Sequence, residues 1–547
     1  MQGKDTNKVK LWLPLLSAIV LVAGMTIGFK LRDSLRSKRD ITTIIQRNDR
    51  LEQIIDLINA RYVDSVNTNL LYEEAVEGII SHLDPHTVYI PADKLQMVNE
   101  ELEGSFFGIG VEFSIVKDTI QITSVIENGP AEAAGIQIGD KLVKVGDSVV
   151  AGTNITSERI IKMLKGKQFS KVFLSMMDPV TQDIRTVTIK RDEIPRYSID
   201  AAIMLDSVTG IIKINRFSES TFEEFEKQLA LLKKQGMQQL VVDLRQNAGG
   251  YMEPAKAIAD EFLSGDKLIV MTKGVHSVPR KYIAGKKGGF EEGKLVILVD
   301  EQSASASEIL AGAVQDWDRG IVVGRRTFGK GLVQDQFDLG DGSALRLTIA
   351  KYYTPSGRSI QRSFANGRDA YHHDFLARYE NGELTGNDSV QVTDTVKYYT
   401  ANKRVVYGGG GITPDVYVPY DTAKISTSLL NLVFSDNVKT TVWNYYFNSK
   451  ATLKSYSSVR EFDKKFRGEV LLKEYLAGLD RQTKKVVDVL LKNEDNRKFF
   501  QRQMKAVLAR MLFRDNGYYA VIYKDDDVVM KALQLLDDSA YTTIVSR

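Results

Sequence analysis

Short apolar runs alternate with amphipathic helical segments across residues 195–360, and this alternation restricts the fold more than any other feature of the chain. QLVVDL at 239–244 and KLVILVD at 294–300 have the unbroken apolar character of strands that are buried on both faces. The segment 221–236 opens with a capping box, T-x-x-E, and ends at a glycine, which indicates a helix. Strands and helices in this order predict an α/β core, a mixed sheet with helices packed on it.

The rest of the 547-residue chain divides into pieces of different character. Residues 40–100 carry apolar side chains at helical spacing, whereas residues 104–192 contain several strand-like runs, turn residues and one short helix. Residues 362–408 are polar and poorly patterned, which is typical of an insertion, and the end of the chain is helical and highly charged. We expect five parts, with the boundaries 1–39, 40–100, 101–192, 193–422 and 423–547.

An apolar run of 19 residues, Leu11 to Phe29, lies near the amino terminus and follows three lysines. Its length is close to the ~20 residues that a helix needs to span a bilayer. No small-residue cleavage site is evident after it, although basic residues follow on that side too. The run therefore predicts an uncleaved signal anchor in the inner (cytoplasmic) membrane, with a single pass and the bulk of the chain on the periplasmic or extracytoplasmic side. A cleaved signal and a buried core helix are the alternatives.

Composition and missing motifs exclude several classes of function. A net charge of +3 gives no reason to expect a nucleic-acid partner, and a chain without cysteine has no thiolate chemistry. His82 and His86 are four residues apart, but Pro85 between them makes a continuous metal-binding helix unfavourable. His372 and His373 lie in the polar insertion, where a solvated loop is the simpler interpretation. We therefore expect neither a metal nor an organic cofactor.

A strand-to-helix junction, VILVDEQSASASEILAGAV, carries the first chemical signal. Ser303, Ser305 and Ser307 alternate with alanines where the helix opens. One serine is explained by helix capping, but three that alternate with small residues also suit a nucleophile beside the free N–H groups of a helix start. Downstream, Lys330 stands between two glycines, and a desolvated lysine can act as a base. Spacing alone leaves open that this lysine is an ordinary turn residue.

SASASEI followed by TFGKGLVQ resembles the Ser–Lys active site of the carboxy-terminal processing (tail-specific) serine protease family. In that family 25 positions separate nucleophile and lysine, and the same spacing here selects Ser305 as nucleophile with Lys330 as general base. The family also has a glutamine four positions after the lysine that orients the amine, and Gln334 occupies that place. The resemblance thus implies a serine endopeptidase with an α/β protease core.

Further segments match landmarks of the same family. DLRQNAGGYM at 243–252 resembles the turn from which a glycine N–H joins the N–H after the nucleophile to form the oxyanion hole. The implied donors are Ala306 together with Gly249 or Gly250. YYTPSGRSIQ and GGITPDV also match, so the resemblance covers roughly residues 40–420.

The β-rich part resembles a PDZ domain inserted into the protease. It contains the GPA…AG…GD pattern in GPAEAAGIQIGDKLVKVGD, and FFGIGVEF stands where the carboxylate-binding loop is expected. The loop residues that the resemblance assigns to a peptide's terminal carboxylate are Gly108, Ile109, Gly110 and Val111. A bound peptide would then pair with the adjacent strand edge. A structural β-module without a ligand is the alternative.

Together these features predict a protease that recognises the free carboxy-terminal tails of exported proteins and cleaves them with a Ser–Lys dyad. The competing assignment is a membrane-tethered PDZ scaffold or chaperone whose protease core is inactive. The C-terminal helical extension does not match the short forms of the family, and packing, oligomer formation or adaptor binding are its expected roles.

Overall fold

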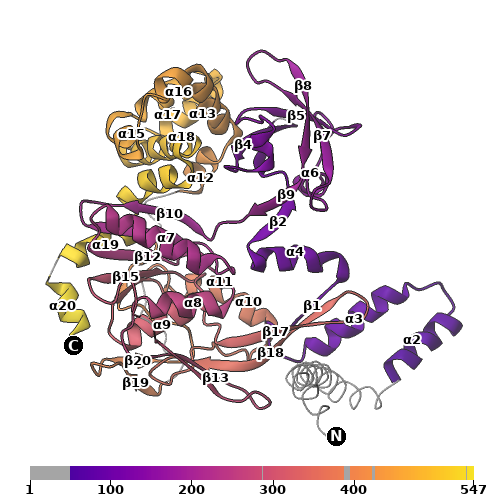
Figure 1. The fold of residues 1–547 in the computed structure, drawn as a ribbon, viewed down its shortest axis with the longest axis vertical. Helices are drawn as coiled ribbons and strands as arrows, with labels where there is room; N and C mark the ends of the chain where they lie inside the picture. The colour runs from indigo at the N-terminus through magenta and orange to yellow at the C-terminus, as the bar shows by residue number, and fades with distance from the viewer. Residues whose placement is uncertain are drawn as a thin grey trace, which may run out of the picture. The chain divides into compact units, whose positions relative to one another are not determined.

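The computed structural model describes residues 50–116, 118–285, 287–386, 395–421, 426–537 and 539–546. The chain forms two compact units, residues 1–83 and 84–547, and the described part of the first contains the helices α2 (Arg50–Arg61) and α3 (Thr68–Ile80). Figure 1 shows the elements of the second unit, which carries the sheets. The division into five parts made above stays a prediction.

A six-stranded sheet forms the centre of the second unit and confirms the predicted α/β core. Its first pair of strands is antiparallel and all later neighbours are parallel. Parallel neighbours need crossover connections, which the helical segments between the strands provide. The strands follow the order β10 (Ile199–Met204), β11 (Thr209–Ile214), β12 (Gln239–Asp243), β15 (Leu295–Val299), β16 (Ile321–Gly324) and β21 (Val416–Tyr417).

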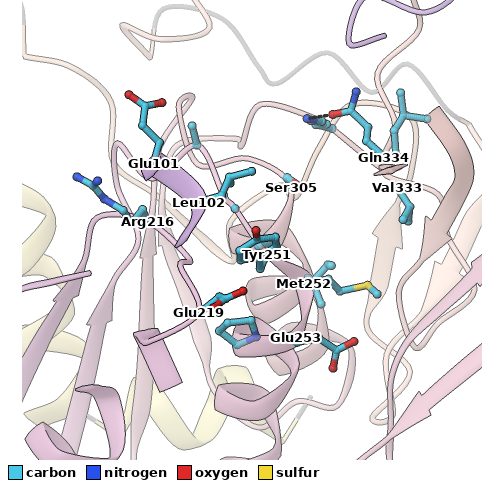
Figure 2. Close-up of a pocket in the computed structure, with 18 of the residues that line it drawn as sticks. Glu101, Leu102, Arg216, Glu219, Tyr251, Met252, Glu253, Ser305, Val333 and Gln334 are labelled. Carbon is cyan, nitrogen blue, oxygen red and sulfur yellow. Dashed lines mark hydrogen bonds between the residues drawn. The ribbon is translucent and has the colours of Figure 1, made fainter. Parts of the chain in front are cut away.

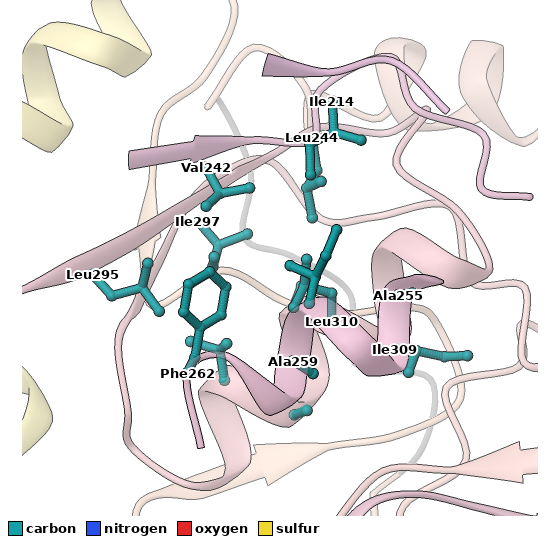
Figure 3. Close-up of a cluster of buried hydrophobic side chains, with 14 of the residues drawn as sticks. Ile214, Val242, Leu244, Ala255, Ala259, Phe262, Leu295, Ile297, Ile309 and Leu310 are labelled. Carbon is teal, nitrogen blue, oxygen red and sulfur yellow. The ribbon is translucent and has the colours of Figure 1, made fainter. Parts of the chain in front are cut away.

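The two faces of this sheet bury different helices. On one face lie α7 (Thr221–Lys234), α8 (Met252–Asp260) and α9 (Ala306–Asp316), whose apolar side chains pack with alternate strand residues (Figure 3). The other face is covered by α19 (Asp527–Asp537) and α20 (Ala540–Val545). The last helices of the extension therefore complete the protease core rather than form a separate appendage.

Leu536 tests this second core layer. Its side chain is fully buried against the sheet, so Leu536→Ala should lower the free energy of unfolding by about 2–5 kcal/mol. Met530, on the same helix, is 47% exposed, and Met530→Ala is the matched control. Urea unfolding of both variants measures the difference. Equal unfolding midpoints would contradict the assigned packing.

A second sheet carries the segment around Lys330. Strand β18 (Ala344–Tyr353) pairs antiparallel with β1 (Val88–Ile90), β13 (Leu268–Lys273) and β17 (Leu332–Asp338). Lys330 lies two residues before β17. Strand β1, which precedes the inserted β-module in the sequence, therefore lies beside β18, which follows it.

The inserted module has its own sheet and its own apolar core, as expected for a PDZ domain. It is entered and left by an antiparallel pair, β2 (Ser105–Gly108) and β9 (Asp192–Pro195). The strand after the FFGIG loop, β3, is at one end of the sheet, so one of its edges has no neighbouring strand within that sheet. Its elements are β3 (Val111–Val116), β4 (Thr119–Val125), β5 (Lys141–Val145), β7 (Lys171–Met177), β8 (Ile184–Lys190) and helix α6 (Ser157–Leu164).

A bundle of short helices precedes α19 and has a separate apolar core. It touches the inserted module, because Ile138 packs against this core and the ring of Phe447 lies against Gly139. The long helix α18 (Glu494–Ile522) is interrupted at Phe513 and Arg514 by non-helical backbone angles. The helical bundle therefore packs against another part of the same chain. A role in oligomer formation or adaptor binding stays a prediction.

The predicted location as a single-pass membrane protein is corrected. None of the helices in the described ranges combines the length and the apolar character that a bilayer crossing requires. The segment Leu11 to Phe29, on which the prediction rested, lies outside the described residues.

Candidate active site

Ser305 lies where strand β15 passes into helix α9. It is the residue before the first helical position and has φ +55° and ψ −112°, a conformation that a residue with a Cβ rarely adopts. Backbone strain of this kind, costing of the order of 1–3 kcal/mol, is typical of functional sites. The Ser305 side chain is partly exposed, whereas Ala306 and the helix behind it are buried.

The three alternating serines differ in burial and in hydrogen bonding. The Ser303 hydroxyl is fully buried and donates to the Leu244 carbonyl at 2.9 Å. The Ser307 hydroxyl is also fully buried and donates to the Asn247 carbonyl at 2.9 Å. Both serve to tie the junction to the loop after β12. Of the three, Ser305 is the one that faces the cavity described below.

Lys330 and Gln334 line the same cavity. Lys330 Nζ donates to Gln334 Oε1 at 2.8 Å. Burial, and then the positive charge of Arg346, lower the pKa of the Lys330 amine from its usual value, while nearby carboxylates oppose the shift. Among the described residues no hydrogen bond joins Lys330 to the Ser305 hydroxyl. An amine with a lowered pKa is neutral, and thus able to accept a proton, at lower pH than a free lysine.

Glu308 ties the nucleophile segment to the lysine segment. Its carboxylate accepts from the N–H groups of Ser305 at 2.9 Å, Gly329 at 2.8 Å and Lys330 at 2.9 Å, and from the Thr327 hydroxyl at 2.5 Å. Burial raises the pKa of Glu308 to about 7, although these hydrogen bonds oppose the rise. Glu308 is absent from the residues of the predicted site. The S-x-x-E spacing from Ser305, a capping-box signal, points to it.

Tyr352 is a second residue that is absent from the predicted site, although it opens the YYTPSGRSIQ segment. Its side chain is almost fully buried, and its hydroxyl donates to the Lys330 carbonyl at 2.7 Å and lies 3.1 Å from the Ser305 carbonyl. The strand β18, which carries Tyr352, thereby holds the two segments at a constant separation. The YYTPSGRSIQ segment matches a family landmark, but that match gives the tyrosine no role.

The glycine turn after β12 lies directly against the nucleophile. A Cβ on Gly249 would stand 2.8 Å from Cβ of Ser305, and a Cβ on Gly250 would stand 2.1 Å from the Phe217 carbonyl oxygen. Both glycines have positive φ, +99° and +141°. A side chain at either position is therefore excluded by contact as well as by backbone conformation.

One cavity of about 1170 Å³ connects these groups. Figure 2 shows Ser305 and Gln334 on its wall, together with charged and apolar side chains from other elements. The residues of the predicted site that line it are Gly249, Gly250, Ser305, Ala306, Lys330 and Gln334. The tertiary fold thus brings all six together from three separate stretches of sequence.

The predicted tail-binding loop lies in the inserted module. Two carbonyls of this loop are already hydrogen-bonded within the module. The Ile109 carbonyl accepts from the Ala131 N–H at 2.9 Å, and the Gly110 carbonyl accepts from the Ile126 N–H at 2.9 Å. In the described chain, neither the Ile109 nor the Gly110 N–H has an acceptor. Val111 begins the edge strand β3 and Gly108 ends β2. Free donors next to an open strand edge are the arrangement that a peptide carboxylate and backbone can use.

The histidines His86 and His276 lie at separate places in the fold. His276 is exposed in the loop between β13 and β14 (Arg280–Ile283), whereas the backbone carbonyl of His86 accepts from Gln334. Burial, followed by the charge of Lys330, lowers the pKa of His86 to about 3, so that its ring is neutral. Within the described ranges, no group of three or more His, Cys, Asp or Glu could hold a metal ion.

Known proteins share both the core and the inserted module. Residues 208–366 match peptidase family S41, residues 95–176 match the PDZ domain, and residues 28–94 match the activating protease CtpB N-terminal domain. The carboxy-terminal processing protease CtpB of Bacillus subtilis (strain 168) is 34% identical over 321 residues, which are 57% of this chain and 65% of that protein.

Two further proteins extend the comparison. A probable CtpA-like serine protease of Staphylococcus haemolyticus (strain JCSC1435) is 32% identical over 358 residues, covering 64% of this chain and 71% of that protein. The solved photosystem II D1 C-terminal processing protease is 26% identical, with 57% of this chain and 89% of that chain covered and a TM-score of 0.33. The chain belongs to peptidase family S41, among the carboxy-terminal processing serine proteases, and carries a PDZ domain.

Proposed function

We propose that the protein cleaves protein tails with Ser305 as nucleophile and Lys330 as general base. Neutral Lys330 takes the hydroxyl proton as Ser305 Oγ bonds to the peptide carbonyl carbon. The protonated amine then donates to the leaving nitrogen as the C–N bond breaks. Water hydrolyses the resulting ester by the same proton transfers. Gln334 holds the amine through the 2.8 Å hydrogen bond and neither gives nor takes the proton.

Two backbone N–H groups are proposed to hold the oxyanion. Ala306 is the first residue of α9, where N–H groups lack partners inside the helix. The Gly249 N–H already donates to Asn247 Oδ1 at 2.8 Å, whereas in the described part of the chain the Gly250 N–H has no acceptor. This difference favours Gly250 over Gly249 as the second donor. Such donors are worth about 10²–10³ in rate.

The observation that carries this proposal is the shared cavity, in which Lys330, held by Gln334, lies with Ser305 at a helix start. A fluorophosphonate reacts covalently with an activated serine and leaves capping serines unmodified. We expect peptide mass spectrometry of the treated protein to find the label on Ser305 alone. An inactive scaffold would take up no label, and a label on Ser303 or Ser307 would move the nucleophile.

We further propose that the PDZ domain captures the free carboxy terminus of a substrate through the Gly108–Val111 loop. A terminal carboxylate accepting from the free Ile109 and Gly110 N–H groups would place the preceding residues along the open edge of β3. Exported proteins are the proposed substrates, since a chain without cysteine suits an oxidising compartment.

Amidation of a peptide tests this recognition. A peptide ending in an aliphatic residue should bind at least about tenfold more weakly as the amide, because hydrogen bonds to a charged group contribute roughly 1.5–3 kcal/mol. Fluorescence anisotropy with the Ser305→Ala protein measures binding without cleavage. Superimposable titrations of acid and amide would refute a carboxylate site in the loop.

A further inference from the structure

The side-chain amide of Gln334 has only one favourable orientation. Its oxygen accepts from Lys330 Nζ at 2.8 Å, and its nitrogen donates to the backbone carbonyl of His86 at 2.5 Å. A peptide carbonyl can only accept a hydrogen bond, and a protonated amine can only donate one. If the amide turned by 180°, its oxygen would face the His86 carbonyl oxygen and its NH₂ group would face the Lys330 amine. The His86 carbonyl therefore decides which end of Gln334 faces the lysine.

That carbonyl is held in place by a short turn, residues 84–87. The Asp84 carboxylate accepts from the His86 N–H at 2.9 Å, the Thr87 N–H at 3.1 Å and the Thr87 hydroxyl at 2.7 Å. The strand β1, which begins at Val88, then pairs with β18. The turn is thus closed by Asp84 and joined at its Val88 end to the sheet that carries Gln334.

The ring of His86 anchors the same turn on its other side. Its Nε2 lies 2.8 Å from the Tyr371 hydroxyl, and the ring packs edge-on against Tyr371 and Phe328, with centroids 5.2 and 6.1 Å away. The ring is neutral, as shown above, and His86 is absent from the described residues that line the cavity. The His86 ring thus contacts the insertion rather than the cavity.

Tyr371 belongs to the segment that the sequence marked as an insertion. Arg362 of that segment stacks on Tyr371 at 4.0 Å and on Phe328 at 4.6 Å, and it donates to the Tyr371 carbonyl at 3.0 Å. The Arg362 N–H donates to the Gly329 carbonyl at 2.9 Å. The insertion thereby packs around the loop that carries Lys330.

We propose that His86 is a positioning residue for the base: held by Asp84 and Tyr371, it orients Gln334, which in turn orients Lys330. This inference rests on the proposed Ser305–Lys330 dyad. Loss of the ring would free the turn, let the amide of Gln334 rotate and admit water around the lysine. Lys330 would then be protonated up to a higher pH, and it would meet Ser305 less often in the productive geometry.

Single-turnover cleavage of labelled casein by the full chain across pH tests the proposal. At neutral pH, His86→Ala should lower the rate by about 10- to 100-fold, a part of the ~10²–10⁴ that general-base catalysis contributes. The rise of the rate with pH should move to higher pH, so that the defect shrinks in alkaline solution. His82→Ala, an exposed histidine four residues earlier, should match the wild type.

A double-mutant cycle separates positioning from a general loss of structure. If His86 acts through Gln334, the His86→Ala/Gln334→Ala protein should be no slower than Gln334→Ala alone. Multiplying losses, or a rate reduced equally at every pH, would overturn the proposal. Should His86→Ala fail to fold, Tyr371→Phe removes one hydroxyl only and should shift the pH profile in the same direction; an unshifted profile would equally overturn it.

The result is distinguishable from failure of the dyad itself. Lys330→Arg, measured alongside, must be inactive if Lys330 is the base. An active arginine variant would refute the dyad. An inactive one, together with a wild-type pH profile for His86→Ala, would refute only the role of His86.

Discussion

Ser305→Ala is expected to abolish proteolysis while the protein stays folded and still binds peptide tails. Removing the nucleophile of a serine protease lowers turnover by a factor on the order of 10⁶. The hydroxyl of Ser305 faces the cavity, and its loss leaves the backbone hydrogen bond to Glu308 in place. Cleavage of casein and the thermal unfolding midpoint are the two measurements.

Ser303→Ala and Ser307→Ala are the matched controls. Each removes a buried hydroxyl that donates to a backbone carbonyl. Each carbonyl keeps a backbone donor, the Asn247 N–H for Leu244 and the Ala304 N–H for Asn247. Loss of one hydrogen bond should therefore cost only about 0.5–1.5 kcal/mol, and both variants should keep most of their activity. The opposite pattern, with an active Ser305→Ala protein and an inactive neighbour, would show that the nucleophile is misassigned.

Lys330→Arg should be as inactive as Lys330→Ala, although it keeps a positive charge. A guanidinium stays protonated in proteins and cannot take the Ser305 proton. Loss of general-base catalysis corresponds to a rate decrease of about 10²–10⁴-fold. Single-turnover cleavage by the three proteins measures it, with circular dichroism as the folding control. Substantial cleavage by the arginine variant would mean that the base lies elsewhere.

The pH profile of the wild type gives an independent test of the same assignment. The base is the neutral amine, so the rate must rise as pH increases through the pKa of Lys330. Burial and Arg346 lower that pKa, so the rise should lie below the ~10.4 of a free lysine. Arg346→Gln removes the charge that opposes protonation, and its profile should move to higher pH. A rise at the free-lysine value in the wild type would contradict a desolvated base.

Local sequence was sufficient for the features that depend on neighbours along the chain. Apolar runs and capping signals predicted the strands and helices of the core, because buried strands and helix ends each impose a short-range pattern. The motif around Ser305, its spacing to Lys330 and the glycine turn at 249–250 identified the family. The single-pass membrane location also came from a local pattern, and no described helix supports it.

Contacts between distant segments could not be predicted from local sequence patterns. The Gln334 amide meets the His86 carbonyl across 248 positions of chain, and His86 meets Tyr371 across 285. Neither pair has a periodic or compositional signature, because a hydrogen bond between remote segments constrains only the two residues involved. The polar insertion shows the same limit: its composition indicates a loop, yet Arg362 and Tyr371 pack around the lysine loop.

The residue types of the chain suggested the chemistry, a serine at a helix start and a lysine between glycines, and the resemblance to the family selected Ser305 and Lys330 as the predicted pair. The reactivity of those residues depends on the fold. Burial lowers the pKa of Lys330, Glu308 joins the two segments through four hydrogen bonds, and the last helices close the second face of the sheet. Each of these effects requires that distant segments of the chain pack together and exclude water. A local sequence pattern does not indicate which segments will be in contact.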